Sequence, residues 1–497
     1  MAIEKSVVII GAGIAGLKAA SDLYAKNCHS CVVLESRDRI GGRLHTVEGY
    51  DGRKYDLGAS WHHDTLMNGL FFEELQLPEQ ERTPFVFDDD DLILFTENGK
   101  RLDHDPKLIL EVLKEELDRF IELQFFESLD VKDISYFQII LKYLYQRRDF
   151  LSDEQLKHLP QLARYLELWH GIDWKTLSGK YAHIDHQGRN AMVLHYSSIV
   201  KRVASSFPRE WLKLSTEVCE VRREGKKVYV KTFEETYVCD YVIVTVPQSI
   251  LELSLHKEAR TGRIEFCPPL NEDIVESFGK VHYGTLGKVV FEFDKCCWST
   301  ERAKILSMGK TPEGFARKVR NATDFCALVK ELDKDTSYEL GNDPWDFPLY
   351  FVNLAKTTGV PSFVMLMQEP LTGYVESLED KRHVYEYFKP ILESLFKALG
   401  SDAPICDFEN GIDDARENVP ILKNVFTTNW TREPYSLGAY SACFPGDDPM
   451  DFILALEKGQ DSRIRFAGEH TVMDGAGCVY GAWESGKREA SYISERL

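Results

Sequence analysis

The chain of 497 residues is 43% hydrophobic and 28% charged, a composition typical of globular proteins and not of disordered, fibrous or repeat proteins. A prior of about 100–200 residues per domain predicts two to four structural units. The formal net charge of −20 argues against nucleic acid as a partner and favours cationic small molecules, although many acidic proteins owe their charge only to solubility.

The N-terminal segment has the pattern of a nucleotide-binding unit. Val7–Ile10 is an uninterrupted apolar run, as in a parallel strand that is buried on both faces. It leads into Gly11, Gly13 and Gly16, which have the spacing G-x-G-x-x-G, and a helical pattern follows. These glycines suit a tight turn, close approach of a pyrophosphate to the backbone and close packing of helix on strand. The free N–H groups at the helix N-terminus favour phosphate.

The next segment indicates which dinucleotide is bound, a nicotinamide or a flavin dinucleotide. A second apolar run, Cys31–Leu34, ends at Glu35, where a carboxylate accepts hydrogen bonds from ribose hydroxyls and disfavours the 2′-phosphate of NADP. Arg37, Gly42 and Arg43 then belong to a run of the form E-x-R-x-R-x-G-G-R, which an NAD site does not need. A second glycine turn with basic partners suits an extended flavin dinucleotide. The segment therefore predicts FAD as the cofactor.

This run resembles the signature of the flavin-containing amine oxidase family, and the chain is most similar to the fungal polyamine oxidases of that family. The resemblance covers nearly the whole chain. It implies an α/β fold in which a Rossmann-like FAD-binding domain is interleaved with an α+β substrate-binding domain, as in p-hydroxybenzoate hydroxylase. The FAD-binding pieces are expected at residues 1–75, 196–260 and 406–497, and the substrate-binding pieces at residues 76–195 and 261–405.

Local patterns agree with this layout. Residues 106–170 have helical periodicity and predict a helical layer over the active site. Short runs rich in β-branched and aromatic residues predict strands within residues 212–221, 228–232, 241–246, 285–295 and 349–370.

A second glycine-rich block lies at residues 462–486. Gly468 ends a strand-like run, Glu469 follows it, and a glycine-rich turn leads into a helix that begins near Val479. The positive end of that helix dipole would stabilise the negative charge of a reduced flavin. Monoamine oxidases tether their flavin through a cysteine in a segment that reads S-G-G-C-Y, and Ala439 stands at that place here. FAD is therefore expected to be bound non-covalently.

The resemblance implies a cofactor site drawn from distant parts of the chain, and no metal site is expected. The cofactor-binding residues that it implies are Gly11, Gly13, Ala15, Gly16, Glu35, Arg37, Gly42, Arg43, Gly58, Ala59, Ser60, Trp61, Val218, Trp430, Gly468, Glu469, Cys478 and Val479.

Three residues are expected to take part in catalysis. Amine oxidation needs a neutral nitrogen and a C–H bond held close to the flavin. Lys288 resembles the family's lysine, which holds a water near the flavin and assists reoxidation by oxygen; the alternative is a surface lysine. His63 resembles a histidine that contacts the substrate, and the alternative is a histidine that satisfies a buried carbonyl. Tyr440 lies in a segment of the form W-x4-Y-S-x-G-x-Y and is expected beside the flavin.

The resemblance also implies a substrate tunnel. Aromatic side chains favour an alkylammonium chain through apolar and cation–π contact, and a carboxylate would pair with a distal ammonium. That carboxylate is assigned to one member of Asp88–Asp91, and the rest of this run is interpreted as a solvated loop. The substrate-binding residues are then His63, Asp89, Trp169, Asn190 and Tyr440.

The sequence thus predicts an oxidase for a cationic polyamine. Spermine, with N-acetylated polyamines as further candidates, would pass hydride to the flavin, and O2 would accept the electrons, giving spermidine, 3-aminopropanal and hydrogen peroxide. One alternative is another flavin amine oxidase that acts on a monoamine or an L-amino acid. A second alternative is a flavoprotein of low turnover that binds a hydrophobic ligand such as a steroid.

The expected setting is the cytoplasm. No apolar stretch approaches the roughly 18 residues of a membrane span, so no membrane is expected as a partner. The eleven scattered cysteines and the N-terminal residues, which lack a signal-peptide pattern, suit a reducing compartment. A monomer or a homodimer is expected.

Overall fold

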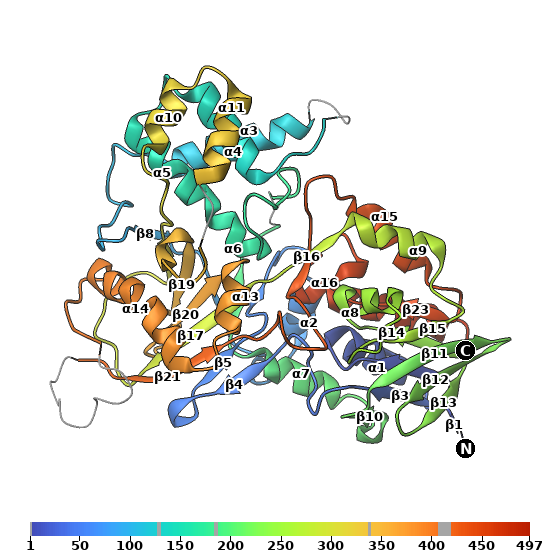
Figure 1. Ribbon diagram of the computed structural model, residues 1–497. Coiled ribbons are helices and arrows are strands. Elements are labelled where there is room, and N and C mark those ends of the chain that lie inside the picture. Colours follow the sequence, from blue (N-terminus) through green and yellow to red (C-terminus); the bar gives the residue numbers. More distant parts are fainter. Residues whose placement is uncertain (1, 127–130, 183–186, 336–338, 406–418) are drawn as a thin grey trace.

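The computed structural model describes residues 2–126, 131–182, 187–335, 339–405 and 419–497 (Figure 1). Its central parallel sheet has the strand order β10-β3-β2-β14-β23. These strands come from distant parts of the chain, and in that order they are Leu212–Lys213, Cys31–Leu34, Val7–Ile10, Tyr241–Val244 and Ile464–Phe466. A parallel sheet built from such pieces, with helices beside it, confirms the predicted α/β class.

The apolar run of β2 is buried on both faces because its residues alternate between two layers. Val7 and Ile9 pack in one cluster with helices α1 (Ile14–Ala25) and α16 (Val479–Ser494), which lie side by side. Val8 packs in another cluster, against a second sheet of order β1-β13-β12-β11-β15. In that order its strands are Ile3–Glu4, Thr236–Cys239, Lys227–Thr232, Val218–Glu224 and Glu265–Cys267.

Two segments in which strands were predicted each form two strands in the structure. Residues 212–221 form β10 and β11, which belong to different sheets, because Ser215 has a left-handed φ of 50° and turns the chain between them. Residues 349–370 form β19 (Leu349–Asn353) and β20 (Ser362–Met367), which pair antiparallel. The prediction of one strand over residues 212–221 was therefore wrong, since a run of apolar residues does not reveal a change of pairing partner. The strands predicted within residues 349–370 are confirmed by β19 and β20.

A six-stranded sheet of order β21-β17-β20-β19-β18-β8 forms the second part of the molecule. One of its faces packs on α14 (Lys381–Ala398), where Phe291 of β17 meets Phe388. The strands not yet given are β21 (Leu422–Thr427), β17 (Gly287–Phe293), β18 (Lys304–Ser307) and β8 (Ile93–Phe95).

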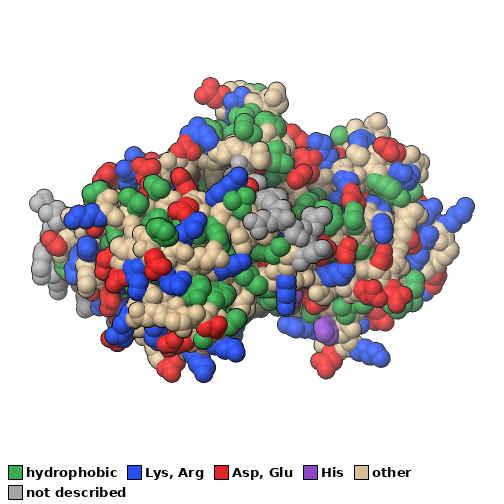
Figure 2. Space-filling view, turned by 90° about the horizontal axis from the view of Figure 1, so that it is seen from above, with side chains coloured by type: hydrophobic (Ala, Val, Ile, Leu, Met, Phe, Trp, Pro, Cys, Tyr) green, Lys and Arg blue, Asp and Glu red, His purple; other side chains and the backbone are tan. Residues whose placement is uncertain are grey.

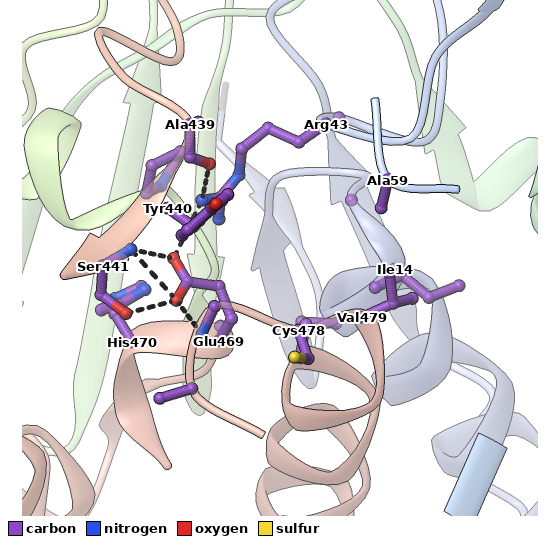
Figure 3. A pocket seen from close by; sticks show the side chains of 18 of the residues that line it. Ile14, Arg43, Ala59, Ala439, Tyr440, Ser441, Glu469, His470, Cys478 and Val479 are labelled. Atoms are coloured by element: carbon purple, nitrogen blue, oxygen red, sulfur yellow. Dashed lines mark hydrogen bonds and ion pairs between the residues drawn. The ribbon is translucent and has the colours of Figure 1, made fainter. Parts of the chain in front are cut away.

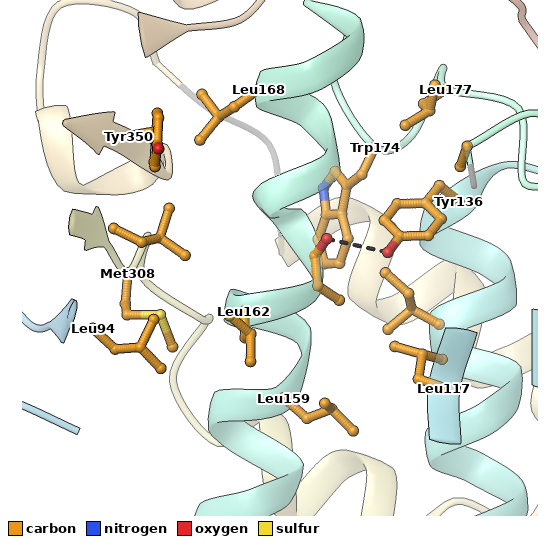
Figure 4. Close-up of a cluster of buried hydrophobic side chains, with 14 of the residues drawn as sticks. Leu94, Leu117, Tyr136, Leu159, Leu162, Leu168, Trp174, Leu177, Met308 and Tyr350 are labelled. Carbon is orange, nitrogen blue, oxygen red and sulfur yellow. Dashed lines mark hydrogen bonds between the residues drawn. The ribbon is translucent and has the colours of Figure 1, made fainter. Parts of the chain in front are cut away.

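The predicted helical layer is present at the top of Figure 1. The predicted segment forms α3 (Leu110–Phe126), α4 (Tyr136–Arg147) and α5 (Asp153–Ala163). The layer also contains α10 (Phe315–Asn321) and α11 (Phe325–Asp335), which the prediction did not include. Their buried side chains form a core with residues of the six-stranded sheet (Figure 4). In that core the Tyr136 hydroxyl donates to the Ala163 carbonyl over 3.1 Å and fixes the end of α5, from which the chain continues into α6 (Glu167–His170).

The division into FAD-binding and substrate-binding pieces stays a prediction, and its boundary at residue 406 lies outside the described residues. No helix in the described ranges is long and apolar enough to cross a membrane.

A buried ion pair fixes α16 to the parallel sheet, and its loss should destabilise the protein. Arg465 Nε of β23 donates to Glu489 Oε2 over 2.7 Å, and the Glu489 side chain is fully buried. Glu489→Ala leaves the guanidinium buried and unpaired, so we expect the free energy of unfolding to fall by about 3 kcal/mol. Urea unfolding followed by circular dichroism measures this change. Glu495→Ala removes a carboxylate that is 72% exposed and serves as the control; an equal loss in both variants would contradict the prediction.

Candidate active site

The two glycine turns predicted from the sequence lie against each other at the carboxyl ends of β2 and β3. Gly11 has a φ of +106°, a conformation that favours glycine. Gly41 N–H donates to the Ala12 carbonyl over 2.8 Å, and Gly41 forms a bridge with Gly13. A Cβ atom on Gly42 would lie 3.3 Å from the Cα atom of Gly13. The turns therefore form one continuous backbone surface.

The first turn leaves room at the start of α1. A Cβ atom on Gly16 would lie 2.1 Å from the carbonyl oxygen of Gly11, so only glycine lets the helix pack on the end of the strand. A Cβ atom on Gly13 would meet nothing within 4 Å, and no side chain caps the helix there. The first N–H groups of α1 thus face open space that suits a phosphate.

Glu35 connects the first turn to a distant segment. Its side chain is buried and accepts from Ala12 N–H over 2.7 Å and from Arg37 N–H over 3.0 Å. The Arg37 guanidinium in turn donates to Glu433 and, over 3.0 Å, to the Ser436 hydroxyl. Glu35 is therefore held at the end of strand β3, and Arg37 connects it to residues 433–436.

The C-terminal block supplies a second acidic residue at the site (Figure 3). Glu469 accepts from Arg43 Nη1 over 2.9 Å, from the Ser441 hydroxyl over 2.6 Å and from Gly477 N–H over 2.8 Å. Burial raises the pKa of Glu469, but the charge of Arg43 and the surrounding donors outweigh it, so the pKa lies below its ordinary value. Helix α16 begins beside this cluster at Val479, as predicted. Cys478 occupies its N-cap position, and its side chain makes no capping hydrogen bond.

One cavity of about 990 Å³ connects these features. Its volume lies within the usual range for ligand pockets, which is about 300–1,000 Å³. Of the residues predicted from the sequence, Gly16, Asp89 and Asn190 are not among those that line it. The predicted residues that line it are Gly11, Gly13, Ala15, Glu35, Arg37, Gly42, Arg43, Gly58, Ala59, Ser60, Trp61, His63, Trp169, Val218, Lys288, Trp430, Tyr440, Gly468, Glu469, Cys478 and Val479.

Lys288 is buried on β17 and reaches the cavity, so the alternative of a surface lysine does not hold. Its Nζ donates to the carbonyl oxygens of Asp56, over 3.2 Å, and of Gly58, and to Ser60 Oγ over 2.7 Å. Nζ also lies 5.5 Å from the ring centroid of Trp61. Burial lowers the pKa of Lys288 to about 8, which brings its titration close to neutral pH.

Aromatic side chains form a wall next to Lys288. The Trp61 and His63 rings stack with their centroids 6.3 Å apart, and Trp169 meets His63 edge-on at 5.7 Å. The Tyr440 hydroxyl donates to the Trp169 carbonyl and joins β22 (Tyr440–Ala442) to α6. Asn190 lies behind this wall, with its Oδ1 2.9 Å from His63 Nδ1. The structure therefore brings together four of the five residues predicted to bind substrate.

The acidic run Asp88–Asp91 lies in a loop, and its members differ in exposure and in partners. Asp89 and Asp91 pair with arginines at the surface, and Asp90 accepts from the Ala303 backbone over 2.8 Å. Only 11% of the Asp88 side chain is exposed; it accepts from Trp61 Nε1 over 3.2 Å, and burial raises its pKa. The interpretation of a solvated loop was thus wrong for Asp88, while the substrate role of Asp89, which is 47% exposed, stays a prediction.

Sequence reasoning missed several residues that the structure places at the site. Ser441 and His470 both interact with Glu469. Each directly follows a predicted site residue in the sequence, Tyr440 and Glu469 respectively. Asp56 stands behind Lys288 and Asp88 behind Trp61, because tertiary packing brings them there and no local pattern distinguishes them.

The residues present fit an extended dinucleotide. Within the described part of the chain, His470 Nδ1 is buried at the cavity without a hydrogen-bond partner. Burial lowers the pKa of His470 to about 4, so the ring is neutral and offers a polar atom to a bound group. The open space beside Gly13 and the uncapped start of α16 provide further room for such a group.

These features define a flavoprotein of the dinucleotide-binding class, and comparison with known proteins identifies the family. Residues 14–494 match the family described as "Flavin containing amine oxidoreductase". The chain belongs to this family. FAD is therefore its cofactor, and the protein is an amine oxidoreductase.

Its relatives have different printed names. The chain is 36% identical to a protein of Candida albicans named "Corticosteroid-binding protein", over 99% of this chain and 96% of the relative. It is 26% identical to "Polyamine oxidase 4" of Oryza sativa subsp. japonica, over 99% of this chain and 89% of that relative. It is 27% identical to "Probable polyamine oxidase 4" of Arabidopsis thaliana, over 100% of this chain and 89% of that relative.

We expect FAD to leave the protein completely on denaturation. Ala439 lines the cavity where a tether would need a thiol, and burial raises the pKa of the nearby Cys478 thiol to about 12, which keeps it protonated and unreactive. Acid precipitation should release all the yellow colour into the supernatant, in the wild type and in Cys478→Ala alike. Flavin that stays attached to a peptide, detected by mass spectrometry, would contradict non-covalent binding.

Proposed function

We propose that the protein is a polyamine oxidase that acts on spermine. Spermine, O2 and water would give spermidine, 3-aminopropanal and hydrogen peroxide. The observation that carries this proposal is the single cavity, which joins both glycine turns to Lys288 and to the aromatic wall of Trp61, His63, Trp169 and Tyr440. We further propose a cytoplasmic monomer or homodimer whose partners are the polyamine and O2.

The residues that would hold FAD lie along the cavity. Glu35 would accept from ribose hydroxyls, and the turn at Gly13 with the start of α1 would face the pyrophosphate. The start of α16 would stabilise negative charge on the flavin ring. When bound, FAD accepts hydride from the amine and passes the electrons to O2. The protein residues position the substrate, exclude water and control protonation.

The environment of the cavity supports an amine substrate. An ammonium has no lone pair to drive hydride from its α-carbon, so the reacting nitrogen must be neutral. Burial against Trp61, Trp169 and Tyr440 disfavours the charged form and promotes loss of the proton. His63, whose Nδ1 lies 2.9 Å from Asn190 Oδ1, would accept a hydrogen bond from the nitrogen through its other ring nitrogen. The net charge of −20 attracts polyamines, while Figure 2 shows acidic and basic side chains interspersed over one face.

A second candidate function is binding of a hydrophobic ligand such as a steroid. It is favoured by the 36% identity to the protein named "Corticosteroid-binding protein". Apolar side chains also line part of the cavity, among them Leu168, Leu286, Leu366 and Phe452. The aromatic wall suits a flat apolar ligand as well as an alkylammonium chain.

Anaerobic mixing with substrate separates the two candidates. For a polyamine oxidase, spermine should bleach the flavin absorbance within about a second, since enzymes typically turn over about 10 times per second. Admission of O2 should restore the colour and release spermidine and hydrogen peroxide. A spectrum left unchanged by spermine, together with saturable binding of corticosterone, would overturn the proposal in favour of the second candidate. N1-acetylspermine, spermidine, a monoamine and an L-amino acid, tested in the same way, define the substrate class.

Lys288→Met should slow reoxidation of the reduced flavin by about 100-fold, the usual scale for loss of one group that transfers protons.

In the wild type we expect reoxidation to slow as the pH rises through about 8, because the pKa of Lys288 is lowered to that value and the ammonium is lost above it. Stopped-flow mixing of reduced protein with O2 measures both effects. Lys227→Met, at an exposed lysine paired with Asp240, is the control. Reoxidation at the wild-type rate in Lys288→Met would remove this residue from the mechanism.

A further inference from the structure

The hydrogen bonds of the Lys288 ammonium all go to one short segment of the chain, residues 56–60. An ammonium has three donors, and those of Lys288 reach the Asp56 carbonyl, the Gly58 carbonyl and Ser60 Oγ. Two of these acceptors are backbone carbonyls, and the third is the Ser60 side chain. Both Ser60 and Lys288 line the cavity. The geometry thus aims the ammonium along residues 56–60 toward the cavity.

The three acceptors of Lys288 are neutral, so they do not balance its charge. A buried cation without a compensating anion is costly. The Asp56 side chain is the nearby anion: it accepts from the Thr46 hydroxyl and, over 3.1 Å, from Tyr196 N–H. Two donors to a carboxylate favour its charged form. Burial raises the pKa of Asp56 above its ordinary value, and these donors and the charge of Lys288 offset only part of that rise.

Two other titratable groups lie around this pair. Burial lowers the pKa of His195 below its ordinary value, so the ring is neutral at pH 7, and the charge of the exposed Lys54 lowers it further. Glu292 follows on the same strand as Lys288, but Tyr50 N–H, the Tyr55 hydroxyl and Asn424 Nδ2 bind its carboxylate.

The neighbouring strands add no further charge beside Lys288. β20 places Leu366 opposite Lys288, and Thr428, which follows β21, accepts from Lys288 N–H through its hydroxyl over 3.0 Å. Asp56, whose carbonyl oxygen lies 3.2 Å from Lys288 Nζ, therefore also carries the carboxylate that opposes the loss of charge from Lys288.

We propose that Asp56 is a positioning residue that keeps Lys288 cationic and directed, past Ser60, at the reacting end of the cavity. The inference rests on the proposed function in one respect, the role of Lys288 in the reaction with O2. A fixed positive charge there stabilises the negative charge that develops on O2 as it is reduced. Asp56 itself does not line the cavity and acts through Lys288.

Asp56→Asn tests the proposal in the FAD-loaded protein. Loss of a nearby anion should lower the pKa of Lys288 by about one unit. Competitive acetylation over a range of pH, with mass spectrometry of the peptide that contains Lys288, measures this pKa without turnover. The pH above which reoxidation slows should fall by the same amount. Glu292→Gln removes a fully buried carboxylate from the strand of Lys288 and should shift neither profile.

An unchanged pKa of Lys288 in Asp56→Asn, or an equal shift in Glu292→Gln, overturns the inference. If Asp56→Asn folds poorly, the double variant with Lys288→Met decides. Charge compensation predicts that Lys288→Met raises the Tm more in Asp56→Asn than in the wild type, because only there is the cation without its anion. An equal change of Tm in the two backgrounds would show a merely structural aspartate. If spermine fails to bleach the flavin while the pKa of Lys288 still falls, the proposed function fails and the pairing of charges stands.

Discussion

The contact between the two glycine turns constrains the rest of the site. β2 and β3 pair in parallel, so their carboxyl ends lie side by side, and Gly41 reaches Ala12 and Gly13 across that edge. The segment that leaves the second turn stays equally close, since a Cβ atom on Gly58 would lie 1.8 Å from the Arg43 carbonyl oxygen. This close path brings residues 56–61 from the nucleotide-binding turns directly to Lys288. One chain of backbone contacts therefore sets the distance between the cofactor region and the reacting end.

Burial of Lys288 shows how the protein holds a costly group at that end. Removal of an ammonium from water costs several kcal/mol even after relaxation. Carbonyl dipoles, a hydroxyl and the face of Trp61 recover part of this cost, and a pKa lowered to about 8 shows that they do not recover all of it. Strand β17 would be more stable with an apolar residue at this position. Groups with such shifted pKa values concentrate at functional sites, which agrees with the position of Lys288 on the cavity.

The parts of the fold and site that could be predicted from the sequence are those with local rules. Gly11, Gly13, Gly16 and Glu35 follow from the geometry of one strand, one turn and one helix, and the helical layer follows from its periodicity. The division of residues 212–221 between two sheets depends on which strands become neighbours. In the same way, nothing local to Asp88 or Asp56 indicates that Trp61 and Lys288 will lie beside them. Roles that arise from packing between distant segments require the folded structure.

The relatives' names combine polyamine oxidases with a corticosteroid-binding protein, and the aromatic wall alone does not separate the two functions. Trp61 and Trp169 offer flat faces to a steroid and to an alkylammonium chain alike. The two ligands differ in protonation. A cavity that lowers the pKa of His470 to about 4 and that of Lys288 to about 8 disfavours positive charge, so it drives a bound ammonium toward the neutral amine that hydride loss requires. A steroid carries no charge, so this environment does not penalise its binding. The electrostatics of the cavity therefore bear on the reaction of a bound amine and not on which of the two ligands binds.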